Sequence, residues 1–188
     1  MTLLVLGLVL FLGVHSIAIV APAWRDAQAA RQPLLWKGAY GAVSLIGFVL
    51  LVQGYGEARV APQVLYVPPA GLRHLAMLLL VPVFPLLWAA YLPGRIQATL
   101  KHPMLVATKL WALSHLLVNG NLADVLLFGG FLAWAVADRI SWKRRPARPV
   151  PGAPAGRFND VIAVVGGLAV YGWFVWQGHA WLIGVAPM

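Results

Sequence analysis

Six long apolar runs constrain this chain more than any other feature of its sequence. They are separated by polar or Pro- and Gly-rich connections and comprise Leu3–Ala23, Leu34–Gly54, Gly71–Tyr91, Pro103–Val118, Leu122–Ala137 and Asp160–Gln177. A helix needs roughly 20 mostly apolar residues to cross the hydrocarbon core of a bilayer. The runs therefore predict an all-α, polytopic transmembrane six-helix bundle that forms one domain over residues 1–188; the alternative is that one run is re-entrant.

The composition supports a membrane protein. Of the 188 residues, 61% are hydrophobic and only 10% are charged, whereas soluble domains average about 45–50% and about 25%. These values exclude an ordinary water-soluble globule. The net charge of +9 suggests nucleic acid as a partner, but the basic residues lie in the connections between apolar runs.

The basic residues predict the orientation of the chain, because Lys and Arg are enriched in short cytoplasmic loops. The second and fourth connections hold only Arg59 and Arg73, and Lys109 lies inside the fourth run. The first, third and fifth connections hold the other eleven: Arg25, Arg31, Lys37, Arg95, Lys101, Arg139, Lys143, Arg144, Arg145, Arg148 and Arg157. We therefore expect the odd connections in the cytoplasm and both termini on the external, periplasmic side.

The fifth connection, residues 139–159, is a basic, Pro-rich cytoplasmic loop in this topology. A dense group of cations beside a membrane favours anionic lipid headgroups. Nucleic acid is the rival partner, but no aromatic side chain is interleaved within Lys143–Arg157 to stack on bases. We therefore expect the lipid bilayer as a partner and no nucleic acid.

Several classes of chemistry are excluded. The chain has no cysteine, which rules out disulfides, thiolate nucleophiles and cysteine-ligated metal clusters. It has only five acidic residues, all in connections or at the ends of runs, and no HExxH, GxSxG or phosphate-loop motif. The separation of the fourth and fifth runs by Asn119-Gly120-Asn121 predicts a tight turn, with Asn121 as N-cap and Asp124 three residues later.

Two histidines inside apolar runs are the candidate functional residues. His15 lies in the first run and His115 in the fourth. Ionisable side chains within a span are costly and mark function by default, and neutral imidazole is a common metal and haem ligand. The alternative is a hydrogen-bonded packing histidine. Helical spacing places Trp111, Ala112 and Asn119 on the face of His115, and Phe11 beside His15. Lys109 either snorkels to the cytoplasmic surface or meets a haem propionate.

The other three histidines are weaker candidates. His102 directly precedes Pro103 and is expected to flank the start of a helix. His74 and His179 lie near predicted external ends, where solvent exposure is the simpler interpretation. His74 is the best substitute ligand, because it and His115 both lie towards the external face. By helix rise, His15 and His115 differ in depth by roughly 5–10 Å, so a shared cofactor requires tilted helices or a tilted macrocycle.

The string around His115 resembles the signature of the NnrU family. It reads Lys101-His102-Pro103-Met104-Leu105, then Leu110-Trp111-Ala112-Leu113-Ser114-His115-Leu116-Leu117-Val118-Asn119-Gly120-Asn121, with Gly13-Val14-His15-Ser16 earlier and Leu126-Leu127-Phe128-Gly129-Gly130-Phe131 later. The similarity in order and spacing covers nearly the whole chain. NnrU proteins are associated with denitrification and nitric-oxide metabolism. The 15-cis-zeta-carotene isomerase, an integral membrane enzyme that carries haem b, belongs to the same superfamily.

The resemblance implies specific roles. His15 and His115 match the isomerase histidines that are expected to bind haem iron, and they are the candidate catalytic and metal-ligating residues here. Trp111, Ala112 and Asn119 would line the haem pocket, with Lys109 as a propionate partner and His74 as a substitute ligand. The isomerase has a cysteine three residues before its second histidine, where this chain has Ala112. A thiolate ligand switch is therefore impossible in this chain.

Three hypotheses follow for a multi-pass protein of a bacterial inner membrane. The first is a haem b enzyme that isomerises a cis double bond of a lipophilic polyene such as zeta-carotene when its iron is reduced. The second is a non-catalytic haem protein that senses or binds nitric oxide or transfers electrons. The third is a haem-free transporter or scaffold. The natural substrate and the oligomeric state are not determined by the sequence.

Overall fold

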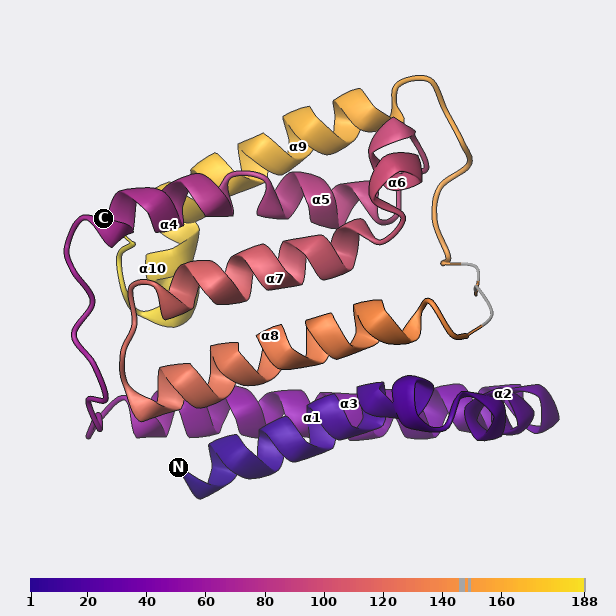
Figure 1. The fold of residues 1–188 in the computed structure, drawn as a ribbon, viewed down its shortest axis with the longest axis horizontal. Coiled ribbons are helices and arrows are strands. Elements are labelled where there is room, and N and C mark those ends of the chain that lie inside the picture. The colour runs from indigo at the N-terminus through magenta and orange to yellow at the C-terminus, as the bar shows by residue number, and fades with distance from the viewer. Residues whose placement is uncertain (146–147, 149, 188) are drawn as a thin grey trace. The chain divides into compact units, whose positions relative to one another are not determined.

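The computed structural model describes residues 1–145, 148 and 150–187, and within them the regular structure is helical. One isolated β-bridge joins Val64 and Asn121. The helices, labelled in Figure 1, are α1 Thr2–Val20, α2 Pro22–Arg31, α3 Pro33–Ala58, α4 Leu72–Leu80, α5 Val83–Ala89, α6 Arg95–Leu100, α7 Pro103–Leu116, α8 Leu122–Ser141, α9 Asn159–Trp173, the π-helix η1 Phe174–Gly178, and α10 His179–Ile183. The predicted all-α class is confirmed.

Prolines explain where helix boundaries differ from the apolar runs. The first run was expected to reach Ala23, but α1 ends at Val20 and Pro22 opens the separate helix α2. Proline suits the first turn of a helix, where its missing N–H has no partner to lose. The third run is divided into α4 and α5 at Pro82 for the same reason. The last run continues beyond Gln177 through η1 and α10 to Ile183.

Four helices are long and apolar enough to cross a membrane by length and composition. They are Thr2–Val20, Pro33–Ala58, Leu72–Ala89 and Asn159–Ile183. The helix α7 has only 14 residues. The helix α8 has 20 residues, but Asp124, Asp138 and Arg139 interrupt its apolar sequence. The structure thus supports a multi-pass membrane protein, and the count of six spans stays a prediction.

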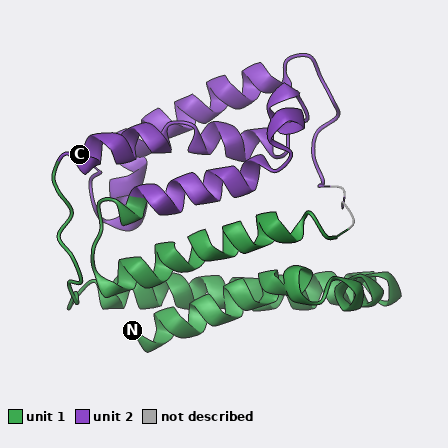
Figure 2. Ribbon diagram, in the orientation of Figure 1, with its two compact units in different colours: residues 1–70, 115–146 green, residues 71–114, 147–188 purple. Residues whose placement is uncertain are grey.

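The chain forms two compact units, each built from two separate stretches of sequence (Figure 2). Unit 1 comprises residues 1–70 and 115–146, and unit 2 comprises residues 71–114 and 147–188. The boundary inside α7 falls between Ser114 and His115. Each unit is described by itself below.

Unit 1 contains a tight antiparallel pair of helices, α1 and α3. A side chain on Gly7 would overlap the backbone of Leu51, and one on Gly54 would overlap the backbone at Leu4. Gly47 likewise faces the backbone of Phe11. Small residues let helices approach closely where no hydrophobic effect drives them together. Three glycines therefore hold the pair in register, although the sequence analysis did not single them out.

The helix α8 completes unit 1 and runs parallel to α1. At its start, Asp124 accepts a hydrogen bond from Tyr55 near the end of α3. At its far end, Arg145 just beyond α8 donates to the carbonyl of Ala18 near the end of α1. Asn121 and Asp124 form the predicted capping box at its N-terminus. Since α3 runs antiparallel to α1, it also runs antiparallel to α8.

Unit 2 packs α9 antiparallel to the broken helix α4–α5. Gly167 lies against the backbone of Pro85, and the hydroxyl of Tyr171 donates to the carbonyl of Met77 at 3.0 Å. Asp160 at the start of α9 accepts the backbone N–H groups of Arg95 and Ile96. The core consists of Val83, Leu86 and Ala107, with Leu80, Leu87, Ile96, Leu100, Val106, Leu110 and Trp111 packed around it.

The predicted basic loop 139–159 begins while α8 is still helical, because α8 continues to Ser141. The next helix starts at Asn159, so the end of the loop agrees with the expectation. Positions 146, 147 and 149 of this loop lie outside the described residues. Ala153 donates its N–H to the carbonyl of Tyr91, which ties the second half of the loop to unit 2.

Candidate functional site

His15 lies in a box of aromatic rings in unit 1. The ring of Phe11 is stacked on its imidazole at a centroid distance of 4.4 Å. Tyr40 of α3 approaches at 5.2 Å and Trp134 of α8 meets it edge-on at 6.0 Å. Three helices therefore contribute one ring each around His15, which is half-buried.

The backbone fixes which nitrogen of His15 carries a proton. Its Nδ1 lies 2.6 Å from the carbonyl oxygen of Phe11. Since a carbonyl only accepts hydrogen bonds, Nδ1 carries the hydrogen and the neutral ring keeps its lone pair on Nε2. Metal-binding histidines are held in this manner, with one nitrogen donating to a carbonyl and the other facing the metal. His15 thus has the tautomer that leaves the lone pair on Nε2.

His115 lies in the last turn of α7, where its ring stacks on Phe128 of α8 at 4.4 Å. Its carbonyl accepts two bonds from Asn119, one from the backbone N–H at 2.8 Å and one from the side-chain amide at 3.0 Å. Asn119, expected to line a pocket, therefore fixes the backbone of His115 and ends its helix. Phe128 determines the plane of the imidazole.

A polar network supports the turn that follows His115. Tyr66 donates its hydroxyl hydrogen to the carbonyls of Leu116 and Asn119, the latter at 2.8 Å. Burial, and to a lesser degree the carboxylate of Asp124, raise the pKa of the Tyr66 phenol. A phenol is protonated at neutral pH and able to donate, and the raised pKa extends that state to higher pH. The carbonyl of Gly120 accepts the N–H groups of Leu65 and Tyr66.

Asp124 is the most buried acidic group in this part of unit 1, with 2% of its surface exposed. One carboxylate oxygen accepts the hydroxyl of Tyr55 at 2.6 Å. The other accepts the backbone N–H and the side-chain amide of Asn121 at 3.1 and 2.9 Å. The charge of Asp124 is therefore hydrogen-bonded on both oxygens, as a buried carboxylate requires.

The remaining predicted site residues lie in unit 2. Trp111 packs at the hydrophobic core around Ala107, and Ala112 is fully buried. Lys109 is half-buried on the same helix, and His74 is exposed on α4. Trp111 and Ala112 share α7 with His115, but the structure gives Trp111 a packing role in unit 2. Nothing described separates the two expectations for Lys109.

The other two histidines have structural roles near helix ends. His102 precedes α7 directly, and its carbonyl accepts the N–H groups of Leu105 and Val106 in the first turn. This position confirms that it flanks a helix start. His179 opens α10, with Nδ1 2.6 Å from the carbonyl of Val185 and its ring edge-on to Phe174.

His15 and His115 contact α8 at different levels. His115 meets Phe128 and His15 meets Trp134, and six residues correspond to about 9 Å of helix rise. Two imidazoles can bind one iron only if both rings reach the same atom. The structure brings both histidines to one helix, and their joint ligation of one iron stays a prediction. Among the described residues, no three His, Cys, Asp or Glu side chains gather as a metal site.

The sequence analysis did not predict the row of aromatic residues on α8 that contacts both histidines. Phe128, Phe131 and Trp134 recur every third residue, and Phe131 lies 5.7 Å from Phe11. Residues three and four apart share a helix face, so this spacing was a readable signal. Tyr40 carried no comparable signal, because its proximity to His15 depends on the register of α3 against α1.

Comparison with known proteins agrees with this picture. The family described as NnrU protein matches residues 3–187, nearly the whole chain. Curated proteins and solved structures give no match. The matched segment contains both histidines and the turn at Asn119–Asn121. The chain therefore belongs to the NnrU protein family.

Proposed function

We propose that this NnrU protein is an integral membrane haem b protein that isomerises a cis double bond of a lipophilic polyene when its iron is reduced. The proposal depends mainly on the environment of His15. Its Nδ1 donates to the Phe11 carbonyl, and aromatic rings surround the imidazole. His15 is the ligand whose orientation the fold fixes, and His115 is the candidate for the second ligand.

The chemistry needs few polar groups from the protein. Bound haem would supply reversible electron exchange with the polyene. The protein residues would hold and enclose the reacting partners: the Phe11 carbonyl retains the proton on Nδ1 of His15, and Tyr40 and Trp134 exclude water. Asn119 fixes the backbone of His115. Lys109 is the proposed partner of a haem propionate. No general acid or base is required, which fits a chain with five acidic residues.

A second function is favoured by the different levels of the two histidines along α8. A single histidine ligand leaves the opposite face of the iron open to a diatomic molecule. Ala112 in place of the isomerase cysteine also removes a thiolate switch. Nitric-oxide binding or sensing without catalysis is therefore the alternative function. It uses the same His15 and the aromatic rings around it.

Absorption spectra of the detergent-purified protein, oxidised and dithionite-reduced, test both functions. We expect a Soret band and about one haem b per chain in a pyridine haemochrome assay, consistent with axial histidine ligation. His15→Ala should lose the haem under both functions, and His115→Ala should lose it if both histidines bind the iron, while the matched control His179→Ala retains it. Full haem occupancy in His115→Ala would show that this ligand assignment is wrong.

The reduced spectrum separates the two haem functions. A shift on adding carbon monoxide or nitric oxide indicates an open iron position and favours diatomic binding. No shift, together with conversion of a cis polyene only under reducing conditions, favours the isomerase. A colourless protein that cannot be reconstituted with haem would overturn both and favour a transporter or scaffold.

The proposed topology is six spans with both termini on the external side of a bacterial inner membrane. Two contacts within unit 1 support it. The turn between α7 and α8 is bonded to residues 63–66, which follow the span α3. At the other end of α8, Arg145 is bonded to Ala18 of the span α1. These contacts place the two ends of α8 level with opposite ends of spanning helices.

A further inference from the structure

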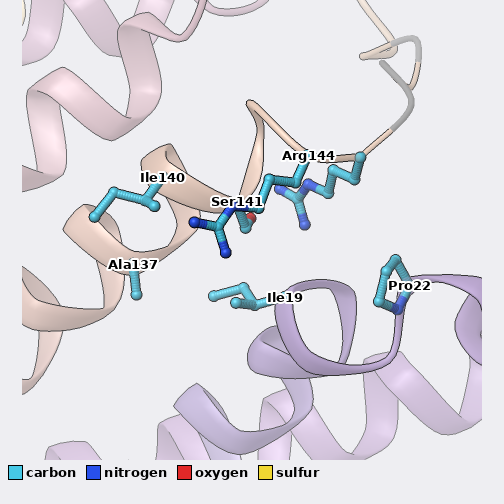
Figure 3. A pocket seen from close by; sticks show the side chains of 7 residues that line it. Ile19, Pro22, Ala137, Ile140, Ser141 and Arg144 are labelled. Carbon is cyan, nitrogen blue, oxygen red and sulfur yellow. The ribbon is translucent and has the colours of Figure 1, made fainter.

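A cavity of about 330 Å³ lies in unit 1 where α1 and α8 end. Figure 3 shows Ile19 and Pro22 facing Ala137 and Ile140 of α8 across it. The rest of its lining is polar and comprises Ser141, Arg144 and Arg145. Neither His15 nor His115 is among its lining residues, and the proposed haem chemistry does not use it.

Arg145 is buried here, with 6% of its side chain exposed. Its guanidinium donates to Asp138 at 2.6 Å and to the Ala18 carbonyl at 2.7 Å. It also lies over the ring of Trp142, 4.8 Å from the centroid. Its Nε, however, is a buried donor for which the described part of the chain provides no acceptor. Buried donors are rarely left unsatisfied, so the residues that the structure describes do not saturate this guanidinium.

The charge of the cavity wall is positive. Asp138 is the acidic partner of Arg145, and the Ser141 hydroxyl donates to the Asp138 carbonyl at 2.8 Å. Arg144 is exposed and lines the same cavity, which leaves one guanidinium charge in excess. Two helix-end carbonyls near the cavity are already occupied: that of Ala18 accepts Arg145, and that of Asp138 accepts Trp142 and Ser141.

The apolar part of the wall distinguishes between sources of an anion. A free phosphate would leave Ile19, Pro22, Ala137 and Ile140 facing water. A phospholipid places its phosphodiester beside guanidinium groups and the beginning of its acyl chains against these residues. Basic pockets between membrane helices at the cytoplasmic side are known to bind anionic headgroups. If α1 spans the bilayer as proposed, the cavity at its end lies at the boundary of the hydrocarbon core.

We propose that this cavity is a specific site for one anionic phospholipid, whose phosphodiester is bound by Arg144 beside the buried guanidinium of Arg145. Arginine suits this role because its planar fork matches phosphate geometry. Binding of this lipid would fix the end of α8 relative to α1 within unit 1.

Native mass spectrometry of the full-length, delipidated protein in detergent tests the site. Phosphatidylglycerol, phosphatidylcholine and inorganic phosphate are titrated separately. We expect phosphatidylglycerol to bind more tightly than phosphatidylcholine, and Arg144→Gln to weaken it about fivefold, as expected for one cation near a membrane surface. Lys143→Gln removes the same charge from a residue outside the cavity wall and should leave binding unchanged. Arg145 is retained because it joins α1 to α8.

A steric variant distinguishes lipid binding in the cavity from a general effect of charge. Ala137 is exposed and lines the cavity, so Ala137→Trp should fill it and reduce phosphatidylglycerol binding with every charge intact. Equal weakening by Lys143→Gln and Arg144→Gln would show a diffuse charge effect and overturn the site. Equal binding of the two lipids, or inorganic phosphate that displaces phosphatidylglycerol at similar concentration, would also overturn it.

Discussion

At the scale of one residue, loss of the Tyr55 hydroxyl should lower the free energy of unfolding measurably. This hydroxyl donates at 2.6 Å to Asp124, which is buried and caps α8. Tyr55→Phe leaves one carboxylate oxygen without its donor, so we expect a loss of about 1.5–3 kcal/mol in the free energy of unfolding. The apparent melting temperature in detergent, followed by circular dichroism, measures it. Tyr91→Phe at an exposed position is the matched control, and an equal effect of both variants would contradict the buried-network argument.

The pair α1–α3 gives a prediction at the scale of an element. Gly54 faces the backbone of Leu4, whereas Gly56 on the same helix has open space where a Cβ would lie. Gly54→Ala should force the helices apart and cost about 1–3 kcal/mol. Gly56→Ala should be neutral or stabilising by up to about 1 kcal/mol, because alanine is the better helix former. Thermal unfolding of both variants measures this difference in stability. A Gly54→Ala protein as stable as Gly56→Ala would mean that the two helices are not in close contact.

The elements also show which parts of the fold the sequence could predict. Apolar length located the helices, and the Asn121–Asp124 spacing predicted the cap of α8 because both depend on local chemistry. The helices α2 and α6 were not predicted, since their residues are too polar to read as spans. Contacts such as Tyr40 with His15, or Tyr55 with Asp124, depend on helix register, which side-chain periodicity does not determine. For the candidate site, sequence located the two histidines, and the structure added the rings that orient them.

At the scale of the whole molecule, the prediction concerns topology. The chain has no native cysteine, so single cysteines report their own side of the membrane. With six spans, Glu57→Cys and Val118→Cys should react with a membrane-impermeant maleimide in spheroplasts, and Lys143→Cys only after the membrane is opened. With four spans, the turn between α7 and α8 stays inside, so protection of Val118→Cys would reject the six-span topology while leaving the four apolar helices intact.

The discontinuous make-up of unit 1 determines when its parts become available during synthesis. The pair α1–α3 is complete once residue 58 has left the ribosome, yet Trp134 and Phe128 are made only after much of unit 2. Until then the imidazole of His15 lacks one wall, and α8 cannot join its partners. Assembly of unit 1 is therefore a late event, and any group that binds in the ring box must arrive after most of the chain has entered the bilayer. A chain truncated before α8 would keep the α1–α3 hairpin but would lack Trp134 beside His15. Completion of the ring cluster therefore depends on the second half of the sequence.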